Sequence, residues 1–400
     1  MLNLDKNKKY LLACSFGPDS MALFKMLLDE GYHFSVAHVN YGIREDANKE
    51  TDDLVNYCKD NNIICHVYYV KEEIKTNVEE KCREIRYEYF KSLMEEHSYD
   101  ALLVAHQEDD LIETYYLQKQ RNILPRHYGL KEETYLFDMN VIRPLLHYKK
   151  SELMDFCKEN GVPFALDYTN FLDIYARNRI RHNVVEKMPD KTREIILETI
   201  KTENEELNSK YQQVDKLEGL TNMQILELDP ICFRIYLNKV AKEVVPDYEV
   251  SKQVAREIRK VLLSAKPNVT LPVSKTLNFV KEYETCFFDF ESSAISFYYL
   301  LEQAGKLDSE FFYLDFTGDT SNRNIKADDY PLVIRNANKD DIYFIKNYPV
   351  KVRRLFIDWK MPLSLRKRWP VILNRDNKII YIPRYRKDFI PDKDCNFYVK

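Results

Sequence analysis

The chain has 400 residues, of which 45% are hydrophobic and 31% are charged, and its formal net charge is −4. This length exceeds one ordinary domain and suits two or three, and the composition is that of a globular protein. No secretion signal follows the first residues and no apolar run approaches the ~20 residues of a membrane span, so we expect a cytoplasmic protein without a membrane partner.

Short apolar runs alternate with amphipathic segments in the first part of the chain. Strands are expected at 10–14, 35–40, 66–70, 101–105 and 141–146, and helices at 19–30, 52–61, 78–97, 109–119 and 149–161. Strands that alternate with helices predict a doubly wound parallel sheet, covered by helices on both faces. Right-handed crossovers place the strand-to-helix loops along one edge of that sheet.

The pattern changes after about Pro189. A highly charged helical stretch at 192–218 precedes further helices between 225 and 263, and a region rich in aromatic and β-forming residues then includes strands at 333–335, 371–373 and 379–382. We therefore expect an α/β domain at 1–190, a mostly helical middle region at 191–305 and a small mixed α/β domain at 306–400.

The junction of the first strand and first helix carries a specific local motif. It reads Ser15-Phe16-Gly17-Pro18-Asp19-Ser20. Such a loop forms an anion site, because backbone N–H groups and the helix dipole point at a phosphate and hydroxyls add donors. It resembles the SGGxDS loop of the PP-loop ATP pyrophosphatases, which hold ATP and release pyrophosphate while they adenylate a substrate. Phe16 stands where that family usually has glycine, and the six residues taken alone fit an ordinary capped turn equally well.

Further segments resemble one family within that class, the tRNA(Ile)-lysidine synthetases. In the family's order they read HVNYGIR at 38–44, RxxRY at 83–87, AHQEDDLIET at 105–114, an RPLL strand at 143–146, DxTN at 167–170 and RNRIRH at 177–182. Tyr41, Gln107 and Leu111 depart from the family's pattern. The resemblance covers roughly the first half of the chain and implies a PP-loop, adenine nucleotide α-hydrolase-like fold.

Acidic residues follow the fourth expected strand. On a helix, residues three and four apart share a face, so His106 and Asp110, Asp109 and Glu113, and Asp110 and Glu113 are expected to be neighbours. Clustered carboxylates repel one another unless a cation lies beside them, and the candidates are a lysine substrate, Mg²⁺ or a nearby arginine. The alternative is a solvated acidic first turn that complements the helix dipole.

The resemblance implies roles for these positions without fixing which acid does what. It implies catalytic roles for Asp19, His106, Asp110 and Glu113, and ATP contacts by the loop 15–20 together with His38 and Asn40. It also implies Mg²⁺ at Asp19. Contacts to lysine or tRNA are implied for Asp109 and for Arg83, Arg86, Arg177, Asn178, Arg179 and Arg181, because arginine suits phosphates and RNA bases. For the arginines, ordinary surface ion pairs remain the alternative.

A basic stretch near the C-terminus is a candidate RNA footprint. Between Lys351 and Lys387 there are twelve Lys and Arg residues and two acids. This excess favours phosphate contacts, and a solvated basic face is the alternative. Trp369 stands beside Arg366, Lys367 and Arg368, and three adjacent side chains on a strand cannot all point the same way. We therefore expect part of the stretch to pack in the core rather than face RNA.

The reaction that the resemblance implies is a carbon–nitrogen ligation. ATP adenylates the C2 oxygen of the wobble cytidine in a tRNA(Ile) with a CAU anticodon, the ε-amino group of L-lysine attacks C2, and AMP leaves. A tRNA thiolase is a competing hypothesis, but it would normally need a cysteine pair, and none of the eight cysteines forms a CxxC motif. Two more hypotheses are an amide-forming PP-loop ligase and a non-catalytic RNA-binding protein with a degenerate loop.

Overall fold

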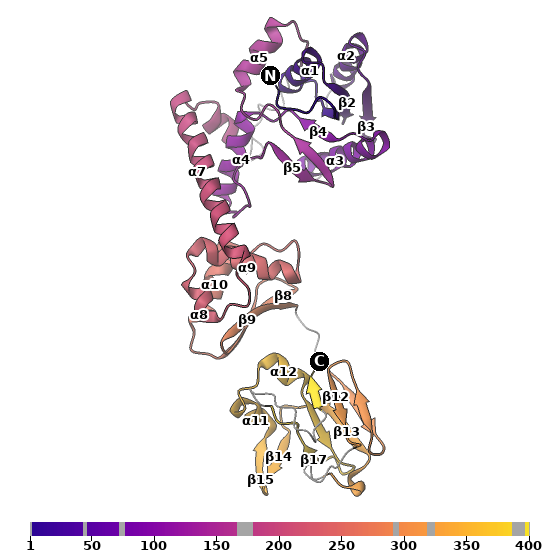
Figure 1. Cartoon of the computed structure of the whole chain (residues 1–400), viewed down its shortest axis with the longest axis vertical. Coiled ribbons are helices and arrows are strands. Elements are labelled where there is room, and N and C mark those ends of the chain that lie inside the picture. The colour runs from indigo at the N-terminus through magenta and orange to yellow at the C-terminus, as the bar shows by residue number, and fades with distance from the viewer. Residues whose placement is uncertain are drawn as a thin grey trace. The chain divides into compact units, whose positions relative to one another are not determined.

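The computed structural model describes residues 2–42, 46–71, 77–165, 179–290, 296–317, 325–385 and 397–399. The chain divides into two compact units, Met1–Gln213 and Val214–Lys400. Figure 1 shows helices around a sheet in the first unit, and helices followed by small sheets in the second. Within the described ranges, no helix is long and apolar enough to cross a membrane.

The first unit is built on a six-stranded sheet in the order β3-β2-β1-β4-β6-β5. Its strands are β1 (Lys9–Ala13), β2 (His33–Asn40), β3 (Cys65–Tyr69), β4 (Ala101–Val104), β5 (Glu133–Leu136) and β6 (Met139–Ile142). All neighbours pair in parallel except β5, which is antiparallel to β6. The order reverses at β1, which lies between β2 and β4. In doubly wound folds, ligands bind at the carboxyl ends of the strands beside such a reversal.

Helices cover both faces of this sheet, as expected. One face carries α1 (Pro18–Asp29), α2 (Ala47–Asp60) and α5 (Lys150–Glu159), and the other carries α3 (Val78–His97). Further helices are α4 (Glu108–Gln120), a π-helical turn at Arg181–Val185, and α7 (Asp190–Asp215), which packs against α4. Side chains alternate along β1: Tyr10 and Leu12 pack with α1, α2 and α5, whereas Leu11 packs with α3 on the other face. This alternation in a run of apolar residues buries the central strand on both sides.

Two features of the sheet differ from the expectation. Strand β5 was not predicted, and the RPLL segment is not a strand, because β6 ends at Ile142. Pro144 has no N–H to donate to a ladder, and the backbone turns instead, with the N–H of Leu146 donating to the carbonyl of Arg143 at 3.3 Å. The turn places the Arg143 side chain, 4% exposed, inside the domain.

The second unit contains the helical region and the strand-rich C-terminal part. Its helices are α8 (Asn222–Glu227), α9 (Pro230–Val244), α10 (Lys252–Leu263), α11 (Val352–Asp358) and α12 (Leu363–Arg368), with a 3-10 turn at Ala327–Asp329. Its strands are β7 (Asn268–Pro272), β8 (Leu277–Glu282), β9 (Thr285–Phe290), β10 (Tyr298–Leu301), β11 (Lys306–Asp308), β12 (Phe312–Asp315), β13 (Leu332–Asn336), β14 (Ile342–Ile345), β15 (Tyr348–Lys351), β16 (Pro370–Leu373), β17 (Ile379–Tyr381) and β18 (Phe397–Val399). Those pairs whose register is described are antiparallel.

The basic stretch contributes both core and surface, as expected. Trp369 is 1% exposed, and its indole N–H donates to the carbonyl of Pro383 at 2.7 Å. Arg366, Lys367 and Arg368 lie on α12 rather than on an extended segment. Lys367 and Arg368 are exposed, whereas Arg366 is half-buried and donates to the carbonyl of Met361.

Candidate functional site

The loop after β1 holds a buried phenylalanine in a backbone conformation that favours glycine. Phe16 has φ of +63° and is 4% exposed, in the core formed with α1. Its carbonyl accepts the N–H of Ala165 at 2.9 Å, which ties the loop to the segment after α5. A bulky residue at positive φ is strained, so burial of the phenyl ring must offset the backbone cost. The backbone at Phe16 therefore keeps the positive-φ conformation that a glycine at this position would favour.

We expect this strain to reverse the usual order of two substitutions. Phe16→Ala should lower the free energy of unfolding by about 3–5 kcal/mol, because the buried ring is lost. Phe16→Gly should be the less destabilising change, since glycine accepts positive φ without strain. Denaturant unfolding of the two variants and the parent measures the order. A Phe16→Gly variant less stable than Phe16→Ala would contradict the strained-loop explanation.

The same loop presents the start of α1 to the edge of the sheet. Gly17 is the N-cap residue and Pro18 occupies the first helical turn. The hydroxyl of Ser20 donates to the carbonyl of Gly17 at 2.9 Å, and the exposed Ser15 accepts the N–H of Gly17 at 3.4 Å. A helix N-terminus following a strand in this way is suited to a phosphate group.

Asp19 lies at the base of this helix in an unfavourable place for a lone carboxylate. Burial, and secondarily the charge of Asp110, raise the pKa of Asp19 to about 7, while Lys150 and Arg181 act in the opposite direction. Its Oδ1 atom is buried and has no hydrogen-bond partner among the described residues. A buried polar atom without a partner is costly, so this geometry suits a carboxylate that receives a cation when substrate binds.

The fit to Mg²⁺ depends on that carboxylate. No group of three His, Cys, Asp or Glu side chains capable of holding a metal occurs in the described part of the chain. Mg²⁺ is commonly bound by one or two carboxylates together with substrate phosphates, and needs no all-protein cage. The unpartnered Oδ1 of Asp19 beside a phosphate-binding helix start fits this mode.

Four buried acids lie at the start of α4: Glu108, Asp109, Asp110 and Glu113. Gln107 caps the helix, accepting the N–H of Asp109 at 2.7 Å, while Asp110 accepts the N–H of Gln107 at 3.0 Å. The alternative of a solvated acidic turn is therefore wrong, because all four acids are at most 8% exposed.

Two arginines divide these acids into two pairs. The guanidinium of Arg181 donates to both oxygens of Glu113 and, at 3.2 Å, to Asp110. The guanidinium of Arg193 donates to Glu108 at 3.0 Å and to Asp109. Asp110 and Glu113 are thus neighbours as predicted, whereas Asp109 shares its arginine with Glu108. A nearby arginine, one of the three candidate cations, is present.

The electrostatics of Arg181 follow from its surroundings. Burial by itself would lower the pKa of Arg181, but the carboxylates of Glu113, Asp110 and Asp109 raise it overall. Arg181 is therefore a fixed positive charge within a negative cluster, and it also influences Asp19. These contacts bring together four predicted site residues from three parts of the chain: Asp19, Asp110, Glu113 and Arg181.

His106 precedes α4 and accepts a hydrogen bond from Arg143. The Nε of Arg143 donates to Nδ1 of His106 at 3.1 Å, so the proton of a neutral His106 lies on Nε2. Arg143 also donates to the carbonyl of Lys131 at 2.8 Å and to the hydroxyl of Thr134 at 3.2 Å. His106 is outside the helix, and it does not share a helix face with Asp110.

His38 and Asn40 are buried and bonded within the domain. His38 Nδ1 lies 2.8 Å from the carbonyl oxygen of Cys14 and Nε2 lies 3.0 Å from the hydroxyl of Thr51, and burial lowers the pKa of His38. The amide nitrogen of Asn40 donates to Asn48 at 2.9 Å and to Thr51 at 3.0 Å. His38 thereby supports the backbone where the phosphate loop begins, and direct contact of either residue with ATP stays a prediction.

The remaining predicted residues are dispersed. Arg83 and Arg86 are exposed on α3, with the Arg83 guanidinium 5.1 Å from the centre of the Tyr87 ring. Arg179 is also exposed, just before the half-buried Arg181. Arg177 and Asn178, together with Asp167, Thr169 and Asn170, lie outside the described residues.

Sequence reasoning missed two arginines that organise this region. Arg143 was recognised only as part of a motif, and Arg193 belongs to no motif. Arg193 lies in the highly charged helical stretch expected at 192–218, 84 residues from Asp109. A local pattern does not contain such a pairing. The signal in the sequence was indirect: acids clustered at 108–113 need cations beside them, and the sequence does not show which arginines supply these.

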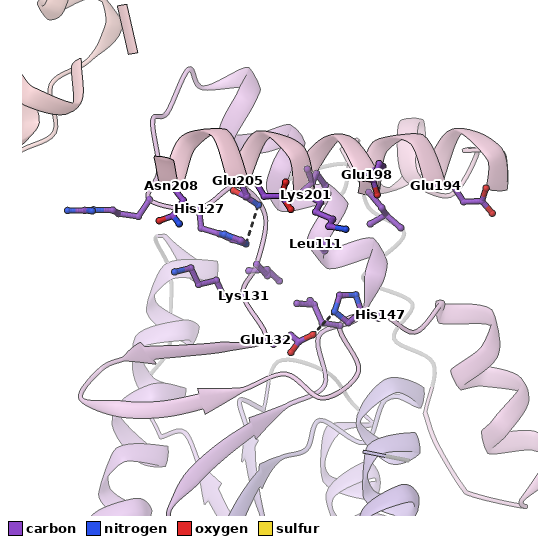
Figure 2. Close-up of a pocket in the computed structure, with 16 residues that line it drawn as sticks. Leu111, His127, Lys131, Glu132, His147, Glu194, Glu198, Lys201, Glu205 and Asn208 are labelled. Carbon is purple, nitrogen blue, oxygen red and sulfur yellow. Dashed lines mark hydrogen bonds and ion pairs between the residues drawn. The ribbon is translucent and has the colours of Figure 1, made fainter. Parts of the chain in front are cut away.

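A cavity of about 830 Å³ opens beside α7 (Figure 2). Its lining includes the apolar Leu111, and Glu194, Glu198, Lys201 and Glu205 come from α7. His147 and Glu132 bond to each other at its rim, at 2.6 Å. The lining therefore mixes both signs of charge.

Comparisons with known proteins identify relatives of this chain. A family model described as the PP-loop domain matches residues 1–188. The tRNA(Ile)-lysidine synthase of Mycoplasma mycoides is 31% identical over 406 residues, covering 95% of this chain and 98% of the relative. That of Bacillus subtilis is 27% identical, covering 97% and 92%. The solved U34-tRNA thiolase NcsA from Methanococcus maripaludis is 17% identical with a TM-score of 0.40, covering 50% of this chain and 74% of that one.

Proposed function

This chain belongs to the tRNA(Ile)-lysidine synthase family, and we propose that it ligates L-lysine to C2 of the wobble cytidine of a tRNA(Ile) with a CAU anticodon. The proposal is supported above all by one observation. The carboxylate of Asp19 lies at the phosphate-binding loop, and its buried Oδ1 has no hydrogen-bond partner among the described residues. Besides burial, the negative charges of Asp110 and Asp109 on α4 also raise its pKa. An ATP site and a cation site therefore adjoin.

The chemistry explains why ATP is consumed. A carbonyl oxygen on cytosine is a poor leaving group, so O2 first attacks the α-phosphate of ATP and pyrophosphate departs. The ε-amino group of lysine then attacks C2, the C2–O bond breaks, and AMP leaves with that oxygen. The amine loses its protons during this sequence, which requires acceptors beside it.

The chain's own residues supply positions for these steps. The start of α1 binds the phosphates, and Asp19 would hold Mg²⁺, which would supply positive charge against the charge moving onto pyrophosphate. Asp110 and Glu113 hold the amino end of lysine, and Arg181 orients both carboxylates through its hydrogen bonds. His106, held by Arg143, presents Nε2–H toward the reacting base. The basic C-terminal stretch and exposed Arg83, Arg86 and Arg179 contact tRNA in the cytoplasm.

Mass analysis of the product tests this proposal directly. We expect that an unmodified tRNA(Ile) transcript, incubated with ATP and lysine, gains one lysine less one water at its wobble nucleotide, with AMP and pyrophosphate formed in equal amounts. A transcript with uridine at the wobble position is the matched control and should stay unchanged. Incorporation of sulfur would indicate a thiolase, and tRNA binding without any ATP turnover would indicate a non-catalytic RNA-binding protein.

A further inference from the structure

A second cavity, of about 740 Å³, is lined by positive charge. Its lining residues are Arg83, His106, Thr114, Leu117, Gln118, Arg121, Ile123, Arg126, His127, Gly129, Leu130, Lys131, Thr134, Leu136 and Arg143. Five of them are Lys or Arg, and none of these described residues is acidic. The cavity beside α7 shares Arg126, His127, Leu130 and Lys131 with it, yet contains several glutamates (Figure 2). Arg126 and Lys131 line both cavities, but only the second lining combines five cations with no acidic residue among the described residues. In a protein with a net charge of −4, such a lining indicates a site for an anion.

The loop that separates the two cavities is fixed on both sides. The N–H of Gly129 donates to the Gln118 side chain of α4 at 2.7 Å, and the N–H of Tyr128 donates to Asn204 of α7 at 2.7 Å. Gly129 has φ of +74°, and a Cβ there would come within 2.7 Å of Leu111. The basic residues at the two ends of this loop are therefore presented by an anchored backbone, which lowers the entropy that a ligand must remove.

Arg143 adds an independent observation. Its side chain is 4% exposed, and its hydrogen-bond partners are neutral: the carbonyl of Lys131, the hydroxyl of Thr134 and Nδ1 of His106. Among the described residues, no carboxylate forms an ion pair with it. The charge of Asp110 acts on this guanidinium, but its hydrogen-bond partners are neutral. A buried guanidinium of this kind in the wall of a cationic cavity suits a site that an anion completes. Through His106, the same arginine connects this cavity to the site of the reaction.

We infer that this cavity binds phosphates of the unpaired RNA strand that flanks the reacting nucleotide. The inference rests on the proposed function, which brings a single-stranded loop of tRNA to His106. RNA recognition of this kind uses unstacked nucleotides, arginine contacts to phosphate, and grooves of positive charge. ATP is the competing anion, but its phosphates already have a site at the start of α1. The cavity thus holds the phosphates of the RNA beside His106 and Arg143, which both line it.

The double variant Arg121→Gln/Lys131→Gln tests this inference. Both side chains are exposed, so the fold should be retained. We expect weaker binding of an anticodon stem-loop RNA, and a log–log dependence of affinity on salt that is shallower by about 1.4, since each phosphate contact contributes roughly 0.7 for single strands. The KM values for ATP and lysine should stay within about twofold at saturating RNA.

The matched control is Lys8→Gln/Lys59→Gln, which removes the same amount of charge from two exposed positions outside the cavity lining. Lys8 lies directly before β1, and Lys59 lies in the last turn of α2. It should leave the salt slope unchanged. Equal slopes for the two double variants, or a loss of ATP affinity in the first with RNA binding intact, would overturn the inference. Lysidine formation by the parent protein decides the proposed function separately, so the two ideas fail by different results.

Discussion

Asp19→Asn is expected to lower the rate of tRNA-dependent AMP and pyrophosphate formation by about 100-fold or more, the size seen when one group that stabilises developing charge is removed. The reason is that Asp19 carries the buried carboxylate oxygen without a partner at the phosphate loop. Asparagine keeps the shape and loses the charge that a cation needs. Single-turnover measurement of AMP release, at saturating ATP, lysine and tRNA, gives the rate.

The same substitution should stabilise the protein without ligands. The pKa of Asp19 is raised in the folded state from 3.8 to about 7, so the folded protein binds this proton more tightly than the unfolded chain does. Stability from this group is therefore present below pH 4 and is lost as pH rises to 7. Asparagine removes that loss, and the melting temperature of the variant at about pH 8 should exceed that of the parent.

Asp29→Asn, at the other end of the same helix, is the control. Asp29 is exposed and pairs with Lys25, so its loss should change neither the rate nor the pH dependence of melting appreciably. A folded Asp19→Asn protein with the parent's turnover would remove Asp19 from the site. A lower melting temperature than the parent's in mildly alkaline buffer would show that its carboxylate has a favourable partner.

The second large effect is expected from Glu113→Gln. Glu113 is fully buried and receives two hydrogen bonds from Arg181. If Glu113 also faces the ammonium of lysine, neutralising it should raise the KM for lysine by about 30-fold or more, because truncating one partner of a buried charge pair costs about 2–5 kcal/mol. The KM for ATP should change much less. Initial rates against each substrate provide the comparison.

Glu108→Gln separates substrate binding from structure. Glu108 is buried on the same helix and also accepts a hydrogen bond from an arginine, but that arginine is Arg193 rather than Arg181. The substitution Glu108→Gln therefore removes a buried carboxylate that faces a different arginine. Both variants should melt at lower temperature, since each leaves a largely buried arginine with fewer partners. Only Glu113→Gln should raise the KM for lysine selectively. Similar lysine KM values in the two variants would mean that Glu113 acts through the fold alone.

The elements that the sequence predicted well are those with a strong local pattern. The helix at 78–97 has the expected bounds, and the strands around Leu11 and Leu103 follow from apolar runs bordered by turns. Strand β5 was missed because ETYL is short and half exposed, and its pairing with β6 depends on the hairpin rather than on its own composition. Helix α12 was missed for a related reason, because six residues carry too little periodicity.

The sequence named residues that the fold brings together, while their roles in a site stay predictions. The resemblance to a family located Asp19, Asp110, Glu113 and Arg181, which the fold brings together. The positive φ of Phe16, the buried oxygen of Asp19 and the pairing of Arg193 with Glu108 and Asp109 depend on contacts between distant segments. Local patterns of charge and hydrophobicity contain no information about such contacts.

Helix α7 sets the minimal length of a fragment that could fold alone. The PP-loop model ends at residue 188, and α7 begins at Asp190, so a fragment cut between them keeps every motif of the first half. It would nevertheless lose Arg193, leaving Glu108 and Asp109 buried without their arginine, and would lose Asn204, which holds the loop at Tyr128. Dissection of the catalytic half should therefore cut no earlier than Gln213, where the first compact unit ends.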